Sequence, residues 1–556
     1  MTSILTDARE QGQEELIESP ERQPSNSNWP GMAVHKDPWL ALAGLAVLGG
    51  VSRLAYSAGF VRPYLLEANY KTPLLDLAKI NGHTAPAANA WAFTWLALFA
   101  AYYLAFRLSP SFSRVSRGFR WAALAIVCGW AAIFCFDLLQ MYPVGAADLF
   151  DQIFRARLTT HYGFNPFTTL PGSLPDDPFL KYVAWRGDAS PYGPIWELLA
   201  AIASIAGNND LFSNLISFKL LVIIAYSISV ALTYSILRLH KPEWALRGTL
   251  FFAWNPLLLF EVAGNGHNDA VVVMFLLLAV YLFVHLNRWA FIPALMLGAL
   301  TKFVPILLVP VAVAALWRDR LRRKGTLTAG PSVLSNSEAF SNIALGVATA
   351  VVLAVVLYLP FWDGFESIGA LGRQSLFTAS LPRVAVDFFN YGLGVPRGVA
   401  EALVRYGALG LVVAVAGILS LSLLLGRNAS TPDERHKLVS RTLRYFYEII
   451  FVYLAFSTLW FQPWYLLWLI ALTAPLARFD LANRTLLFCL GGVANYFVWD
   501  FVWLWNRTDA RSIQITAAIA VYTLPLFYTL YTLARPLWER PSGIDDGAAL
   551  AQPAAG

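Results

Sequence analysis

The chain has 556 residues, of which 57% are hydrophobic and only 14% are charged, and its mean hydropathy is +0.53. Soluble domains carry about 25% charged residues, so this composition excludes an ordinary soluble protein and predicts an all-α integral membrane protein. The net charge is +6, and the basic residues gather in short loops, which indicates membrane orientation and not nucleic-acid binding.

Apolar runs occupy most of the chain between two polar tails, 1–36 and 541–556, which we predict to be disordered and cytoplasmic. Several of the runs are shorter than the roughly 20 residues that a perpendicular helix needs. The three cysteines lie inside such runs, which is typical of small buried hydrophobes and not of disulfides or metal ligands. We predict about fourteen spans, near 38–59, 88–106, 120–138, 212–237, 247–262, 269–286, 289–301, 303–317, 342–360, 403–425, 446–460, 464–477, 484–504 and 513–534.

The distribution of Arg and Lys predicts that both termini are cytoplasmic. The richest basic clusters fall on one side only if Tyr192–Ala206 lies at the membrane interface and 289–317 turns at Thr301–Phe303. Six polar stretches then share the opposite, non-cytoplasmic face, and we expect a functional site where they converge. These stretches are 139–211, 264–269, the turn at Lys302, 361–402, 462–465 and 505–512.

The first long outer loop opens with a charged segment that contains Asp148, Asp151, Arg155 and Arg157. A carboxylate near an interface can act as a general base if it reaches a substrate hydroxyl. Alternatively, the two aspartates are solvated or pair with the arginines at helical spacing. The residues leave both interpretations open.

The segment 255–269 reads NPLLLFEVAGNGHND and interrupts an apolar run. Ionisable groups at membrane depth are costly, so they usually face a cavity or a partner. The simpler explanation is a polar turn in which Asn268 or Asp269 caps the next helix. Capping does not require Glu261 and His267 as well, so we favour a functional turn.

Cations and aromatic residues near the outer face also have two explanations. Lys302 lies between two apolar half-spans, where it either snorkels to the interface or holds an anion such as a phosphate. Arg373 and Arg383 of the long outer loop have the same two explanations. Trp464 and Tyr465, which follow Gln462, are explained more simply as an interfacial aromatic belt, although such rings also stack on sugars.

Neither a GxxxxGK[ST] loop nor a GxGxxG motif occurs, so we do not expect nucleotide binding. An activated substrate must then already be membrane-bound.

The order of these motifs resembles the GT-C superfamily of polytopic glycosyltransferases, most closely its bacterial polyprenyl-phosphate-mannose-dependent mannosyltransferases. The resemblance covers about 120–480. Each motif alone is weak evidence for this family, but all of them occurring in this order is a fairly specific signal. The motifs are Asp148 with Arg155 and Arg157, then Gly163–Phe167, Pro191–Pro194, Asn255–Pro256, Glu261, Gly266–Asp269, Lys302 with Pro305, and Gln462–Tyr465.

The resemblance implies an inverting transfer of a hexose, mannose or a similar sugar, from a polyprenyl-phosphate carrier to a lipid or cell-envelope glycan. It implies Asp148 as the base, with Asp151 as a rival because Asp151, Gln152 and Ala156 depart from the family's pattern. Phosphate binding would fall to Arg157, Lys302, Arg373 and Arg383. Sugar or acceptor binding would fall to Glu261, His267, Asn268, Asp269, Tyr192, Gln462, Trp464 and Tyr465.

The resemblance implies no cofactor and assigns no metal-binding residues, since many family members do not require a metal. It also implies a location in the bacterial cytoplasmic membrane with the site on the outer face. The domain organisation it suggests is two additional N-terminal spans, 37–118, before a catalytic domain, 119–540. Two alternatives stay open. A transporter or flippase of lipid-linked sugars would usually show internal repeats, which we do not find here. A non-catalytic scaffold of a glycan-assembly complex would tolerate neutralisation of Asp148.

Overall fold

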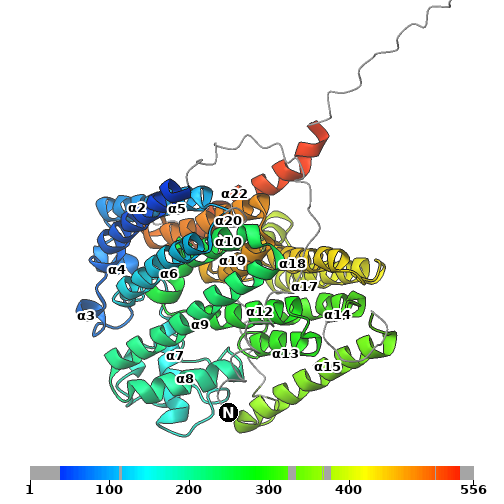
Figure 1. The fold of residues 1–556 in the computed structure, drawn as a ribbon. Coiled ribbons are helices and arrows are strands. Elements are labelled where there is room, and N and C mark those ends of the chain that lie inside the picture. The colour runs from blue at the N-terminus through cyan, green and yellow to red at the C-terminus, as the bar shows by residue number, and fades with distance from the viewer. Residues whose placement is uncertain are drawn as a thin grey trace, which may run out of the picture. The chain divides into compact units, whose positions relative to one another are not determined.

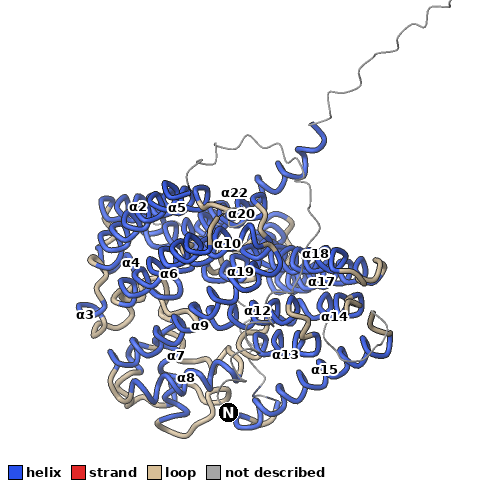
Figure 2. The backbone as a smooth tube through the Cα atoms, in the orientation of Figure 1, coloured by secondary structure: helices blue, strands red, loops and turns tan. Residues whose placement is uncertain are grey.

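A computed structural model describes residues 38–111, 115–322, 333–365, 367, 377–506 and 509–538. The predicted tails and Arg373 lie outside these residues. The described chain is built of helices joined by loops, with four isolated bridges and no β-strand (Figure 2). The predicted all-α fold is therefore confirmed.

Each of the fourteen predicted apolar runs coincides with a helical segment. Eight helices in the described part of the chain are long and apolar enough to cross a membrane. These are Pro38–Val61 (α2 and η1), Ala85–Leu108 (α5), Arg117–Leu139 (α6), Leu211–His240 (α9), Asn336–Phe361 (α15 and η8), Arg397–Leu424 (α17), Phe479–Asn506 (α20, η13 and α21) and Ala510–Trp538 (α22).

The remaining runs form shorter or broken helices, because polar and proline residues interrupt them. The count of fourteen spans stays a prediction. The shorter helices include Ala245–Ala253 (α10), Pro256–Leu259 (α11), Phe260–Gly264 (η6), Asp269–Val284 (α12), Arg288–Ala299 (α13), Val304–Leu308 (η7), Val309–Arg318 (α14), Pro463–Tyr465 (η12) and Leu466–Leu476 (α19). The predicted run 446–460 instead begins inside Pro432–Val452 (α18), a 21-residue helix whose first half is charged, and continues into Tyr453–Ser457 (η11).

Two helices of the predicted outer loop are among the shorter ones, with 13 and 14 residues. Asp148–Thr160 (α7) and Pro194–Gly207 (α8) pack against each other, and α8 also packs along α9 (Figure 1). The predicted interfacial segment Tyr192–Ala206 thus contains a short helix that begins at Pro194. Proline is tolerated there because the N–H of the first helical residue has no partner within the helix. The predicted break at Thr301–Phe303 lies between α13 and η7.

The helices around the centre bury several polar residues. The apolar run 247–262 breaks at Asn255–Pro256, where Asn255 Oδ1 accepts a hydrogen bond from Leu258 N at 3.1 Å and caps α11. The chain then widens into the π-helical turn η6, which ends at the turn 265–268 before α12. Residues 261–269 are all buried, so this turn lies inside the helix packing.

The predicted outer stretches meet at one end of the helices. Gly193 N donates to Thr301 O at 3.0 Å, Asn165 Nδ2 to Phe361 O at 2.7 Å, and Thr378 N to Leu459 O at 3.1 Å. At the other ends of these helices, Asp319 pairs with Arg288 at 2.9 Å and Arg435 at 3.2 Å. These contacts join several of the predicted outer stretches to one another, while Asp319, Arg288 and Arg435 of the predicted cytoplasmic loops form a separate cluster.

Candidate functional site

A cavity of about 410 Å³ lies where the outer stretches meet. Its lining combines one carboxylate, two cations, several aromatic rings and apolar side chains. Its lining comprises Asp148, Pro191, Tyr192, Lys302, Phe303, Val304, Leu307, Arg405, Tyr406, Leu409, Val412, Tyr453, Ser457, Thr458, Leu459, Trp460, Trp464, Tyr465 and Trp468. Five of the predicted site residues are thus brought to one cavity: Asp148, Tyr192, Lys302, Trp464 and Tyr465.

Asp148 is half-buried at the start of α7. The chain leading to it is held by the buried turn, because Gly145 N donates to Asn265 Oδ1 at 3.1 Å. Further along, a Cβ at Gly266 would stand 3.0 Å from the Leu149 side chain, next to Asp148. The two predicted stretches, around Asp148 and around His267, therefore pack directly on each other.

Asp151 does not line the cavity. Its buried carboxylate accepts hydrogen bonds from Trp185 N at 2.9 Å and Ala184 N at 3.3 Å, and lies 3.9 Å from Arg155. Burial raises the pKa of Asp151 to about 6, although Arg155 and the backbone donors act to lower it. The predicted pairing with an arginine at helical spacing is confirmed for Asp151 and Arg155, and Asp151 holds the loop at 184–185 in place.

Glu261 is the centre of a buried hydrogen-bond network that does not itself line the cavity. It accepts from Asn265 Nδ2 at 2.8 Å and Tyr496 Oη at 2.8 Å, while His267 Nε2 lies 3.4 Å from its carboxylate. Because Asn265 also binds Gly145, this network connects Glu261 to the segment that carries Asp148.

His267 reaches the cavity through an aromatic partner. Its ring stacks on that of Trp464 with centroids 4.0 Å apart. Trp464 is only 4% exposed, so the interpretation of this residue as an interfacial belt anchor is wrong: it packs inward between His267 and the cavity. Tyr465 lines the same cavity.

Lys302 is paired inside the protein. Its Nζ lies 3.1 Å and 3.0 Å from the two carboxylate oxygens of buried Asp269, and 4.6 Å from the centroid of the Tyr465 ring. The expectation that Asn268 or Asp269 caps α12 is wrong, because the helix shows no side-chain cap from Asn268 and Asp269 binds Lys302. The Asn268 amide Nδ2 is buried without a hydrogen-bond partner among the described residues.

The other predicted cations lie elsewhere. Arg157 donates to Asp177 and Asn209, both at 2.8 Å, and stacks over Phe179. Although burial acts to raise it, hydrogen bonds from Tyr162 and Arg157 hold the pKa of Asp177 below its usual value. Arg157 therefore ties the outer loop together and is not among the cavity residues.

Arg383 and Gln462 are likewise absent from the cavity lining. Arg383 Nε donates to Asp387 at 3.1 Å within the short helix Leu381–Asp387 (α16). Gln462 occupies the cap position of η12. Tyr192, by contrast, lines the cavity and receives a hydrogen bond from Gln152 at 3.2 Å.

Arg405 is a cavity residue that the sequence reasoning missed. It lies in α17, between apolar residues of a run read only as a membrane span. The sequence did contain a signal for Arg405, namely its position inside an apolar run. Burying a cation in a membrane costs free energy unless the cation faces a cavity or a partner.

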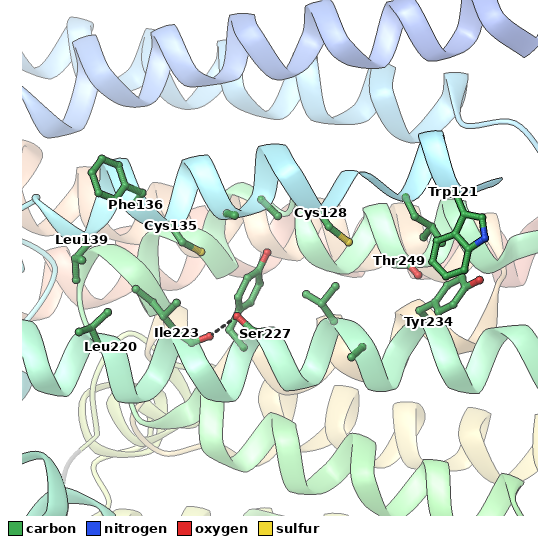
Figure 3. A pocket seen from close by; sticks show the side chains of 16 residues that line it. Trp121, Cys128, Cys135, Phe136, Leu139, Leu220, Ile223, Ser227, Tyr234 and Thr249 are labelled. Carbon is green, nitrogen blue, oxygen red and sulfur yellow. Dashed lines mark hydrogen bonds between the residues drawn. The ribbon is translucent and has the colours of Figure 1, made fainter. Parts of the chain in front are cut away.

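A second cavity, of about 550 Å³, lies between α6 and α9 (Figure 3). Cys128 and Cys135 point into it from α6, and Ser227 uses its hydroxyl to bond Ile223 O on its own helix at 2.8 Å. Its lining contains no Asp, Glu, His, Lys or Arg. It suits lipid hydrocarbon and offers no group for acid–base chemistry. Throughout the described ranges, no three His, Cys, Asp or Glu side chains are arranged to hold a metal ion.

Comparison with known proteins gives a family match over residues 41–318, half of the chain, to "Alpha-(1->6)-mannopyranosyltransferase, N-terminal domain". Among curated proteins, the chain is 24% identical over 384 residues to alpha-(1->6)-mannopyranosyltransferase B of Corynebacterium glutamicum, covering 65% of this chain and 59% of that protein. It is 25% identical over 362 residues to alpha-(1->6)-mannopyranosyltransferase A of Mycobacterium tuberculosis, covering 61% of this chain and 63% of that protein. The aligned part thus spans about three-fifths of each relative.

Proposed function

The chain belongs to the alpha-(1->6)-mannopyranosyltransferase family, and from this premise we propose that it transfers mannose from a polyprenyl-phosphate carrier to a lipid or glycan acceptor. The proposed setting is the bacterial cytoplasmic membrane, with the cavity on the outer face. The relatives' names give an α-(1→6) linkage, which we extend to this chain. An inverting transfer that yields an α-mannoside requires a β-linked donor.

The observation that carries this proposal is the composition of the 410 Å³ cavity, whose lining includes the carboxylate of Asp148, the cations Lys302 and Arg405, aromatic rings and apolar residues. An amphipathic donor has the same three parts: a sugar, an anionic phosphate and a hydrocarbon chain. Aromatic faces such as Trp464 and Tyr465 suit the apolar side of a sugar ring.

In the proposed reaction, the acceptor hydroxyl oxygen bonds to the anomeric carbon while Asp148 takes the hydroxyl proton. The bond from the anomeric carbon to the phosphate oxygen breaks, and its electron pair leaves with the phosphate. Because the leaving group is an anionic phosphate, the site needs cations more than a strong acid. Carboxylates near the sugar also favour a transition state with oxocarbenium character.

The Glu261 network is joined to the segment that carries Asp148 through Asn265 and Gly145. A base must come within about 3 Å of the proton that it takes, and this connection helps to hold Asp148 at the cavity. Asp151 also supports α7, by holding the loop at Trp185.

The test uses purified protein in lipid nanodiscs with radiolabelled polyprenyl-phosphate-mannose and a lipid acceptor extract. Wild type, Asp148→Asn and Asp151→Asn are compared for transferred label. Transfer by wild type and, to a reduced extent, by Asp151→Asn, but not by Asp148→Asn, is expected. Loss in Asp151→Asn alone would reassign the base. No transfer by wild type, together with translocation of the donor by the same protein in sealed liposomes, would favour a flippase.

A further inference from the structure

Two cations, Lys302 and Arg405, line the cavity, and among the described residues only one of them is paired with a carboxylate. Lys302 is paired with buried Asp269. Arg405 has no carboxylate within ion-pair distance among the described residues, and its Nε is buried without a hydrogen-bond partner there. Its one contact of note is with the Phe377 ring, at 5.9 Å. Arg405 therefore brings a net positive charge to the cavity wall.

We propose that Arg405 binds the phosphate of the lipid-linked donor and stabilises it as it leaves, an inference that rests on the proposed function. Arg157 and Arg383, which the sequence suggested for this task, are paired with Asp177 and Asp387 outside the cavity. An arginine suits the task because its planar group donates two parallel hydrogen bonds to phosphate oxygens.

The arrangement around Arg405 also assigns the direction of the bound donor. Arg405, Leu409 and Val412 follow one another on one face of α17 at helical spacing. At 1.5 Å per residue, this strip runs for about 10 Å from the arginine. Val304 and Leu307 of η7 line the same cavity. The sugar then lies toward Asp148, the phosphate at Arg405, and the prenyl chain between α17 and η7.

The charge at the phosphate changes during the reaction, which makes Arg405 more than a binding residue. The donor phosphodiester carries one negative charge, and the released phosphate monoester carries about 1.5 to 2 near pH 7. A cation at this position therefore binds the leaving group more tightly than the donor. Such differential binding accelerates the chemical step.

The experiment measures binding of polyprenyl phosphate and of the uncharged polyprenol to protein in phosphatidylcholine nanodiscs. Variants are Arg405→Gln, Arg405→Lys and the matched control Arg397→Gln. Arg397 lies on the same helix, is exposed, and pairs with Glu401 away from the cavity. Inorganic phosphate and phosphatidylglycerol are added as competitors, to separate a lipid-phosphate site from a site for free phosphate or for any anionic lipid.

We expect Arg405→Gln to weaken polyprenyl phosphate binding by about 10- to 100-fold, the range for loss of a charged hydrogen-bond partner. Polyprenol binding stays unchanged, Arg405→Lys is intermediate, Arg397→Gln matches wild type, and neither competitor displaces the ligand at equimolar concentration. Equal binding of polyprenyl phosphate by Arg405→Gln and wild type overturns the role of Arg405 while the proposed donor stands. Wild type that prefers polyprenol or either competitor overturns the donor itself.

Discussion

Gly145 offers a direct test of how the base is positioned, because it has no room for a side chain. A Cβ at this residue would stand 2.5 Å from Asn265 Nδ2 and 2.8 Å from Tyr496 Oη. Carbon and other heavy atoms in contact prefer about 3.5 Å, so Gly145→Ala forces a displacement of about 1 Å. Asn265 cannot turn away freely, since it binds both Gly145 N and Glu261.

The displaced segment ends at Asp148, three residues later. A misplacement of about 1 Å can reduce catalysis by up to about 100-fold, so we expect Gly145→Ala to lower kcat/KM for sugar transfer by about 10- to 100-fold. The strain and the disturbed hydrogen bonds should also lower the free energy of unfolding by about 1–3 kcal/mol. The assay is initial-rate transfer in nanodiscs, with the midpoint of thermal unfolding measured on the same samples.

Gly187→Ala is the matched control. Gly187 lies in the same outer loop, and nothing would stand within 4 Å of its Cβ. Near-wild-type transfer by this variant is expected. If Gly145→Ala transfers sugar at more than half the wild-type rate, the tight seating of the Asp148 segment on the Asn265 turn is irrelevant to catalysis and the reasoning fails.

Three further predictions concern charged groups of the outer half. A folded-state pKa of about 6 for Asp151 means that the folded protein binds this proton more tightly than the unfolded chain. Its ionisation therefore removes stability as the pH rises from about 4 through about 6, by at most about 3 kcal/mol. Asp151→Asn should flatten the dependence of the unfolding midpoint on pH in that window, and an unchanged slope would contradict the assignment. Arg157→Gln should speed proteolysis of the outer loop, because it leaves Asp177 unpaired, and it should change KM for the donor little. A large change in KM without faster proteolysis would instead support the predicted role of Arg157 in phosphate binding. Lys302→Met should lower the free energy of unfolding by about 3–5 kcal/mol, because it leaves Asp269 as an unpaired buried charge. The double variant with Asp269→Asn should recover most of the loss in the thermal unfolding midpoint. If the losses of the two single variants add in the double variant, the two residues are not coupled.

The helical architecture was readable from the sequence because it depends on local physics. Long apolar runs must satisfy their backbone hydrogen bonds internally, so they form helices wherever they enter a membrane. The breaks were readable for the same reason, since Asn255–Pro256 and Thr301–Phe303 place proline or polar residues where a helix would continue. The motif order led to the GT-C resemblance, which the family match confirms.

The site was only partly readable. The sequence showed which polar residues are unusual for a membrane protein, and Asp148, Tyr192, Lys302, Trp464 and Tyr465 indeed line one cavity. It indicated the local pair of Asp151 and Arg155, but it could not show the contacts that join residues distant in sequence. Lys302 meets Asp269 across 33 positions, and Tyr496 reaches Glu261 across 235.

Arg405 illustrates what the tertiary structure alone decides. In sequence, it is one arginine in a long apolar run, and Arg157 or Arg383 has an equal claim to a phosphate. Arg383 pairs with Asp387 one turn further along its own helix, whereas the folding of the outer loop pairs Arg157 with Asp177 and the packing of α17 places Arg405 on the cavity wall without a carboxylate among the described residues. Composition and hydropathy thus determine the membrane fold, whereas the burial of each charge and the choice of its partner depend on which helices pack together.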